Sequence, residues 1–321
     1  MSPVTFRPAT IDDVALAADL MTAAYPPEPE DPIALAYDWN HPQKDRPVAR
    51  YMVELEGRPV GLATWSHADW QLDPDRYCFV WVAMDREVRT KTSLADALKQ
   101  LEAEALRESP RMLRTFCNAD QPDVMEVLTE AGFKQDRTSR VFELDLAKHG
   151  PRLVDEARRA RQKTEAAGIA LMTLDADPDP DKVRKLYELS EASRQDIPRS
   201  TPRVPHSFES FMDGLAAPWT RLDRYWIARD ADRLVAESHL VFPPVRGTVW
   251  TGYTGSDRAY RGRGIASATK LQTLAQAFEL GVPYVRTDND AENAAMVHIN
   301  ERLGYTGLPR SMSLVKRVKS T

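Results

Sequence analysis

The chain has 321 residues, 42% of them hydrophobic and 28% charged, and its formal net charge is −5. This length is enough for two ordinary domains, and the composition is that of a folded globular protein. There is no broad basic field, no apolar run of about 18 residues and no signal-peptide start, so we expect a cytoplasmic protein that binds neither nucleic acid nor membrane. The two cysteines and six histidines show no metal-ligand spacing, so we expect buried thiols and no metal site.

The first half of the chain opens with a short strand at residues 4–7. Thr10, with Asp13 three residues later, forms a capping box that starts a helix at Ile11. The acidic, proline-rich residues 26–45 are expected to be a solvated loop, or to flank a cationic acceptor. Strands follow at residues 51–55, 59–65, 78–83, 112–117 and 141–146, with helices from about Ser93 and from Pro122.

The second half shows the same order of elements. Its strands are expected near residues 169–174, 225–229, 234–241, 249–254, 284–287 and 311–315. Because strands come consecutively and then alternate with helices, each half should be a mixed α/β (α+β) unit with helices on both faces of its sheet.

An internal repeat with a period near 172 explains this similarity. Arg114 and Thr115, a helix, and the stretch from Glu130 to Phe133 recur at residues 286–287 and 302–305 with the same spacing. The sequence therefore predicts two copies of one domain, at residues 1–149 and 168–321. The Arg-rich residues 150–167 have helical composition and are predicted to be a linker helix.

One loop of the second copy has the pattern of an anion-binding site. A strand ending near Thr254 runs through residues 255–260 into a glycine loop, and then into a helix that Gly281 ends. The first turn of a helix leaves backbone N–H groups free, and its dipole attracts anions. The residues of this loop are Arg261, Gly262, Arg263, Gly264, Ile265 and Ala266.

The first copy lacks both glycines. Its matching stretch begins with Arg89, and Thr92 or Ser93 is expected to cap the following helix with its own hydroxyl, with Asp96 in the first turn. A side chain would then occupy the place of the anion, so this copy should bind a phosphate-bearing ligand weakly or not at all.

The loop resembles the pyrophosphate loop of the GNAT superfamily of N-acetyltransferases, with Arg261, Gly264 and Ala266 in the places of that pattern. The likeness continues through Thr287, Asp288 and Asn289 to the stretch 300–305. Two copies in one chain are similar to mycothiol synthase and other bacterial tandem acetyltransferases. The resemblance implies two tandem GNAT-like domains, each a mixed, mostly antiparallel sheet, with the first copy degenerate and the second active.

The resemblance also implies how acetyl-CoA would bind. The fourth strand of the second copy would part from the fifth, and the pantetheine arm would lie between them, with Gly255 and Ser256 offering backbone hydrogen bonds. Asn289 and Asn293 would reach the pantetheine amides or the nearby loop. An asparagine at a strand end or helix start is equally expected as a helix cap.

The implied reaction is direct attack of an amine on the acetyl thioester, for which a general base is useful. Glu237 is the candidate base, although it could also be a solvent-facing carboxylate at the sheet edge. Asn300 stands where many family members place a tyrosine that protonates the leaving thiolate. An amide is no acid of ordinary pKa, so a water or Tyr253 would replace it, or Asn300 is structural.

The acceptor site should lie in residues 190–224, which include Asp196, Ile197, Pro198 and Arg199 and the stretch from Phe208 to Phe211, unless these form an ordinary surface loop and helix. We therefore expect a monomeric or homodimeric N-acetyltransferase for a small-molecule amine, with acetyl-CoA as co-substrate. A catalytically weak acetyl-CoA-binding or scaffold protein is the alternative. A dinucleotide oxidoreductase is disfavoured because the loop lacks the glycine spacing of such enzymes.

Overall fold

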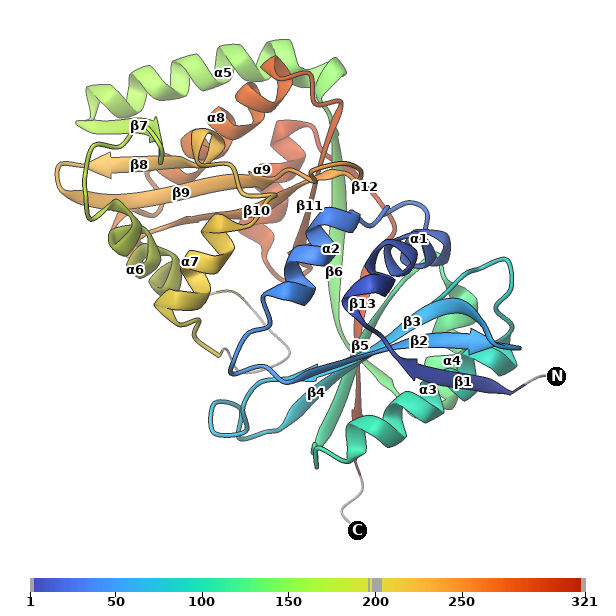
Figure 1. Cartoon of the computed structure of the whole chain (residues 1–321). Helices are drawn as coiled ribbons and strands as arrows, with labels where there is room; N and C mark the ends of the chain where they lie inside the picture. Colours follow the sequence, from blue (N-terminus) through green and yellow to red (C-terminus); the bar gives the residue numbers. More distant parts are fainter. Residues whose placement is uncertain (1–2, 196, 198–203, 319–321) are drawn as a thin grey trace.

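The computed structural model describes residues 3–195, 197 and 204–318. One continuous mixed sheet runs through them in the order β1-β2-β3-β4-β5-β13-β6-β11-β10-β9-β8-β7, and β12 pairs with β6 beside this path. Among the described strands, the pairs β4/β5 and β10/β11 are parallel and the others are antiparallel. The prediction of two mixed, mostly antiparallel units with helices on both faces is confirmed, and the two sheets are joined into one (Figure 1).

The first half confirms the predicted strands and differs at residues 26–45. That segment contains helix α2, because Asp31 caps it through the N–H groups of Ile33 and Ala34 and a proline follows the cap. The expectation of a solvated loop was wrong. The elements are β1 (Val4–Pro8), α1 (Val14–Ala24), α2 (Pro32–Asn40), β2 (Val48–Leu55), β3 (Arg58–His67), β4 (Tyr77–Met84), α3 (Lys91–Leu106), β5 (Met112–Asn118), α4 (Pro122–Glu130) and β6 (Lys134–Asp145), with a 3-10 turn at Ile11–Asp13 before α1.

The predicted strands of the second half are again present. At the junction of the two halves, strand β6 begins seven residues earlier than the expected strand 141–146, and Leu146 already belongs to helix α5. Helix α5 covers most of the linker predicted at residues 150–167. The elements are α5 (Leu146–Ala166), β7 (Ile169–Thr173), α6 (Lys182–Arg194), α7 (Phe208–Ala216), β8 (Trp226–Asp230), β9 (Arg233–Val241), β10 (Val249–Ser256), α8 (Ile265–Glu279), β11 (Tyr284–Asp290), α9 (Ala294–Leu303), β12 (Thr306–Gly307) and β13 (Ser311–Arg317).

The two halves exchange their last long strands. β13, from the end of the chain, pairs with β5 of the first half over residues 311–317. β6, from the end of the first copy, pairs with β11 of the second half over residues 139–145, and β6 and β13 also pair with each other. Figure 1 shows both strands between the halves. In space, each copy is completed by a strand of the other. The domain boundaries 1–149, 150–167 and 168–321 therefore describe the repeated sequence and remain a prediction.

Helices cover both faces of the sheet and divide its core. Alternate strand residues face opposite sides: Met52 packs with α1 and α2, whereas its neighbour Val53 packs with α3 and α4. In the second half, α5, α8 and α9 cover one face, and α6 packs on the other. Asp31 adds a link between the halves, because its second carboxylate oxygen accepts from the N–H groups of Val245 and Arg246.

The exchanged strand should carry much of the stability of the first half. Leu314 of β13 is 1% exposed and belongs to the same core cluster as α3 and α4. Leu314→Ala should lower the free energy of unfolding by about 2–5 kcal/mol, the usual cost of this truncation in a core. Denaturant unfolding measures the change. Leu280→Ala is the control, because Leu280 is 47% exposed, and an equally small effect of both substitutions would contradict the role of β13.

Candidate functional site

Strands β10 and β11 part soon after they begin. They pair only at Val249 with Val285 and at Trp250 with Arg286, whereas β10 remains paired with β9 as far as Ser256. The β9–β10 register shifts at Gly252, a β-bulge that bends the strand. A Cβ on Gly252 would lie 2.3 Å from Nε2 of His239, so a larger residue at this bend would have to displace that ring. The result is a gap between two strands that are each held on their far side.

A cavity of about 850 Å³ occupies this gap. It extends from the loop before α8, between the two strands, to α6 and to the exchanged strands. Nine of the predicted coenzyme-binding residues line it, namely Gly255, Ser256, Arg261, Gly262, Gly264, Ile265, Ala266, Asn289 and Asn293. Arg263 lies outside the lining, with its guanidinium carbon 5.0 Å from the centroid of the Tyr260 ring.

The start of α8 is open toward the cavity. Gly262 and Gly264 have φ values of +74° and +79°, which favour glycine, and Gly264 is the N-cap. No side chain among the described residues caps this helix, and the N–H of Ala268 is bonded to the Gly264 carbonyl. The N–H groups of residues 265–267 therefore have no partner within the helix and are available to an anion.

The corresponding helix of the first copy is closed by its own side chains. Thr90 Oγ1 accepts from the N–H of Ser93, and Ser93 Oγ accepts from the N–H of Thr90. The predicted cap at Thr92 or Ser93 was wrong, because the helix begins at Lys91 and its cap is Thr90. A hydroxyl nevertheless occupies the place that is open in the second copy.

The first copy retains a gap of its own. β4 and β5 pair only from Tyr77 to Phe79 before they part, and a cavity of about 470 Å³ lies beside them. Positions 172 residues apart line the two cavities, for example Leu98 and Lys270, or Val127 and Ile299. The first cavity has aromatic walls, including Trp81 and Phe116, so the repeated fold encloses two chemically different spaces.

The three asparagines of the prediction lie near one another on the α8 and α9 side of the gap. Asn293 caps α9 by accepting from the N–H of Met296, and it also lines the cavity. The cap interpretation is therefore confirmed for Asn293. Asn300 is fully buried and lies behind the lining, where its Nδ2 donates to Oδ1 of Asn289 at 2.6 Å.

Lys270 of α8 is a functional candidate that sequence reasoning missed. It is fully buried, lines the cavity and donates to Oδ1 of Asn300 at 2.8 Å. Burial lowers the pKa of its ammonium group to about 7. A lysine on a buried face of α8 was the available signal, because Leu274 and Ala277, four and seven residues further along that face, are apolar and buried.

The α6 side of the sheet holds the candidate base. Glu237 is fully buried, so the expectation of a solvent-facing edge carboxylate was wrong. Tyr225 donates its hydroxyl proton to Oε2 of Glu237, and Oε1 has no hydrogen-bond partner among the described residues. Burial raises the pKa of Glu237. Burial also lowers the pKa of His239, which stacks on Tyr225, to about 3, so this imidazole stays neutral.

Between Glu237 and the cavity lies a polar layer. The hydroxyl of Tyr253 donates to Oγ of Ser193 at 3.0 Å, and the guanidinium carbon of Arg194 lies 3.8 Å from the Tyr253 ring centroid. These three residues line the cavity, whereas Glu237 does not. Because Glu237 is not part of the lining, a proton from the cavity reaches it only through intervening groups.

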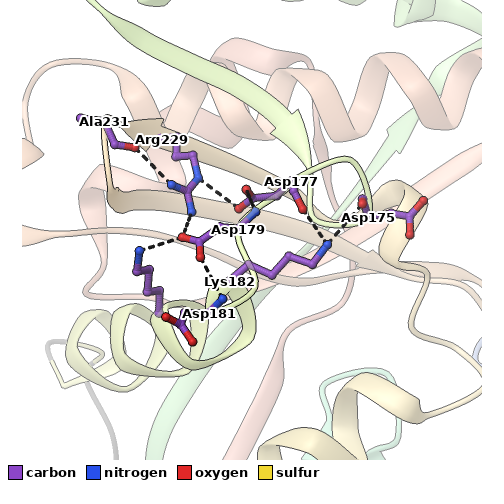
Figure 2. Close-up of polar contacts among 8 residues, drawn as sticks. Asp175, Asp177, Asp179, Asp181, Lys182, Arg229 and Ala231 are labelled. Atoms are coloured by element: carbon purple, nitrogen blue, oxygen red, sulfur yellow. Dashed lines mark hydrogen bonds and ion pairs between the residues drawn. The ribbon is translucent and has the colours of Figure 1, made fainter.

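Helix α6 is fixed in place by a network at its start (Figure 2). Arg229 of β8 binds Asp177 and Asp179 of the segment that leads into α6, and Lys185 of α6 binds Asp179 at 2.7 Å. Lys182 donates to the carbonyl of Asp177 at 2.8 Å. Since Asp177 is 2% exposed, the network anchors the segment on the sheet and so positions Ser193 and Arg194 over the gap.

The predicted acceptor segment is described only in part. Asp196, Pro198 and Arg199 lie outside the described residues, and Ile197 lines the cavity. The stretch from Phe208 to Phe211 begins α7, capped by Ser207. In the described part of the chain, no cluster of three or more histidine, cysteine, aspartate or glutamate side chains could hold a metal ion. No described helix has the length and apolar character needed to cross a membrane.

Comparison with solved structures places this arrangement in a known fold. A tandem GNAT protein from the clavulanic acid biosynthesis pathway superimposes with a TM-score of 0.78 and 17% identity, over 99% of each chain. The fold is that of a tandem GNAT protein. A GCN5-related N-acetyltransferase from Sphaerobacter thermophilus gives a TM-score of 0.72 at 19% identity, over 99% of this chain and 96% of that one. A putative acetyltransferase from Pyrococcus horikoshii gives 0.57 at 13% identity, over 99% and 91%.

No protein-family model matches the sequence, and no curated protein matches it. Because the identities are below 20%, these similarities establish the tandem GNAT fold of this chain and not its activity.

The buried Lys270 predicts how stability depends on pH. The lysine pKa is 10.5 when unperturbed and about 7 in the folded chain, so below pH 7 folding carries the full cost of burying the charge, up to about 5 kcal/mol. Between pH 7 and 10.5 the unfolded state binds a proton that the folded state lacks, and this cost disappears as pH rises.

Lys270→Met should therefore be more stable than the natural protein at pH 6–7, and the difference should shrink toward pH 9. Urea unfolding at several pH values measures both trends. A variant that is less stable than the natural protein at pH 6–7 would contradict the cost of the buried charge.

Proposed function

We propose that this protein is an N-acetyltransferase that moves the acetyl group of acetyl-CoA to the amine of a small molecule by direct attack. The observation that supports this most strongly is the cavity between the parted strands, which ends at an open helix start with two glycines and Arg261 beside it. Pyrophosphate fits this end through backbone N–H groups and the helix dipole. The pantetheine arm would follow the unpaired edge of β10 at Gly255 and Ser256.

The two faces of the gap would divide the reaction. The amine would approach from the α6 face, where Tyr253, Ser193 and Arg194 line the cavity, and its proton would pass through this layer to Glu237. The polar lining at that end, with Arg194 and Asp288, suits a small polar amine. The thiolate would leave on the face of α8 and α9. Asn289 and Asn293 are the proposed contacts of the pantetheine arm.

A screen of small amines with acetyl-CoA, followed with a thiol reagent, tests the function directly. Transfer predicts thiol release that depends on an added amine and yields an N-acetyl product by mass spectrometry. Binding of acetyl-CoA without amine-dependent thiol release would favour the alternative, a coenzyme-binding or scaffold protein.

Gly264→Ala should weaken acetyl-CoA binding at least tenfold, about 1.4 kcal/mol, because the new methyl group would project into space empty of protein where the pyrophosphate is expected. Calorimetry measures the affinity. Gly281→Ala is a matched control: its φ is +78°, its added methyl group also meets no atom, and it lies outside the lining at the far end of α8. Equal losses in the two variants would mean that backbone strain alone is responsible.

Glu237→Gln should lower turnover by about 100-fold or more, in the range of general base catalysis, and leave acetyl-CoA affinity unchanged. The amide has the shape of the carboxylate and can still accept from Tyr225, so the packing should survive. Steady-state rates and calorimetry on the same preparation give both quantities. Turnover within twofold of the natural protein would exclude Glu237 as the base.

A further inference from the structure

Lys270 is a buried cation without a buried anion. Its side chain is fully buried, it forms no ion pair with any carboxylate among the described residues, and its contacts are Oδ1 of Asn300 at 2.8 Å and the Tyr305 ring, 5.2 Å away at the centroid. An ammonium group in such surroundings is costly for folding. Unlike the other buried polar groups of α8, it reaches the wall of the large cavity.

The first copy shows that the fold does not require this lysine. At the positions 172 residues earlier, Lys270, Asn289, Asn300 and Tyr305 correspond to Leu98, Cys117, Leu128 and Phe133. All four of these side chains are buried in the core of the first half, with exposures of 5% or less. The same four backbone positions therefore carry apolar side chains in the first copy and polar side chains in the second. Since folding does not require the polar side chains, the cavity that Lys270 faces has to explain the free-energy cost of burying them.

The position of Lys270 in α8 gives its place along a bound coenzyme. It lies five residues, about 7.5 Å of helix, beyond Ile265 at the open helix start, on the side of the gap formed by α8 and α9. A pantetheine arm that begins at the helix start and follows β10 inward passes this point. Asn300 and Asn289 hold the amine through consecutive hydrogen bonds, which orients it at the wall.

We propose that Lys270, positioned by Asn300, donates the proton that the coenzyme A thiolate takes up as it leaves. This role rests on the proposed acetyl transfer. The acceptor nitrogen forms the C–N bond, the C–S bond breaks with its electron pair on sulfur, and an Nζ–H proton of Lys270 passes to sulfur. The proton that the acceptor amine loses goes toward Glu237, and Lys270 regains its own from solvent once coenzyme A departs.

The chemistry of the groups agrees with this assignment. Asn300 has no proton of ordinary acidity, whereas an ammonium group has. With a pKa of about 7, Lys270 is a stronger acid than an ordinary thiol near 8.5, so the transfer to sulfur is downhill. Burial is the only cause of this pKa. The titratable side chain that faces Lys270 is Tyr305, whose pKa burial raises, and the charged residues of the cavity lining are Arg114, Arg137, Arg194, Arg261, Asp288 and Asp290.

The test compares Lys270→Met with the natural protein in two measurements. The first is the affinity for coenzyme A, measured by calorimetry, which requires no acceptor. Lys270→Met should change this affinity by less than about threefold, because the proton moves only as the C–S bond breaks. The second is kcat as a function of pH. Lys270→Met should lose about 100-fold or more in kcat, together with the decline at high pH that follows deprotonation of Lys270.

Two further variants complete the design. Lys270→Leu carries the side chain of the first copy and gives the same readouts if Lys270→Met does not fold. Lys316→Met is the matched control, because the Lys316 ammonium also lies over an aromatic ring, 5.5 Å from the centroid of Phe133, but pairs with Glu102 outside the cavity. It should change neither the affinity for coenzyme A nor kcat.

The outcomes separate this role from the function on which it rests. A kcat within twofold of the natural protein and an unchanged decline at high pH in Lys270→Met, in a protein that binds and transfers acetyl groups, would overturn the role of Lys270 alone. Failure of the natural protein to bind acetyl-CoA would reject the proposed function, and the role of Lys270 with it.

Discussion

The gap between β10 and β11 depends on the hydrogen bonds that hold each strand on its far side. β11 pairs with β6 along seven residues, and β10 pairs with β9 to its end, so the two can part after two shared positions without leaving either strand unsupported. β6 belongs to the first copy in sequence. The first half of the chain therefore supplies the strand that keeps one wall of the cavity in place, which gives a physical reason for it to be retained even where its own loop lacks the glycines.

The two copies show how one fold can be adapted to different spaces. Both have a fourth strand that parts from the fifth and a helix that begins beside the gap. In the first copy, Thr90 and Ser93 satisfy the helix start, and Leu98 and Leu128 lie beside the gap. In the second, Gly264 leaves the helix start open, and Lys270 and Asn300 occupy those same positions. These differences lie in side chains at equivalent positions, so the comparison within one chain separates what the cavity requires from what folding requires.

Much of this could be predicted from the sequence, because the signals were local. The glycine loop and the alternating strands depend on residues close together in the chain, and the repeat is a direct comparison of two stretches of the same sequence. The strand exchange could not be predicted, since β6 and β13 present the same apolar pattern whichever neighbour they pair with. Helix α2 was missed because charge and prolines outweighed the cap at Asp31. Glu237 was identified as a candidate, but its burial depends on Tyr225 and on α6, which the sequence does not place over it. Lys270 was overlooked since a lysine in a helix is usually at the surface.

The most direct test of coenzyme binding between β10 and β11 is the structure of the protein crystallised with acetyl-CoA. We predict one coenzyme per chain in this gap, with its pyrophosphate at the N–H groups of residues 265–267 and its sulfur beside Lys270. A coenzyme bound only in the gap between β4 and β5, or one whose pyrophosphate lies away from the start of α8, would contradict it.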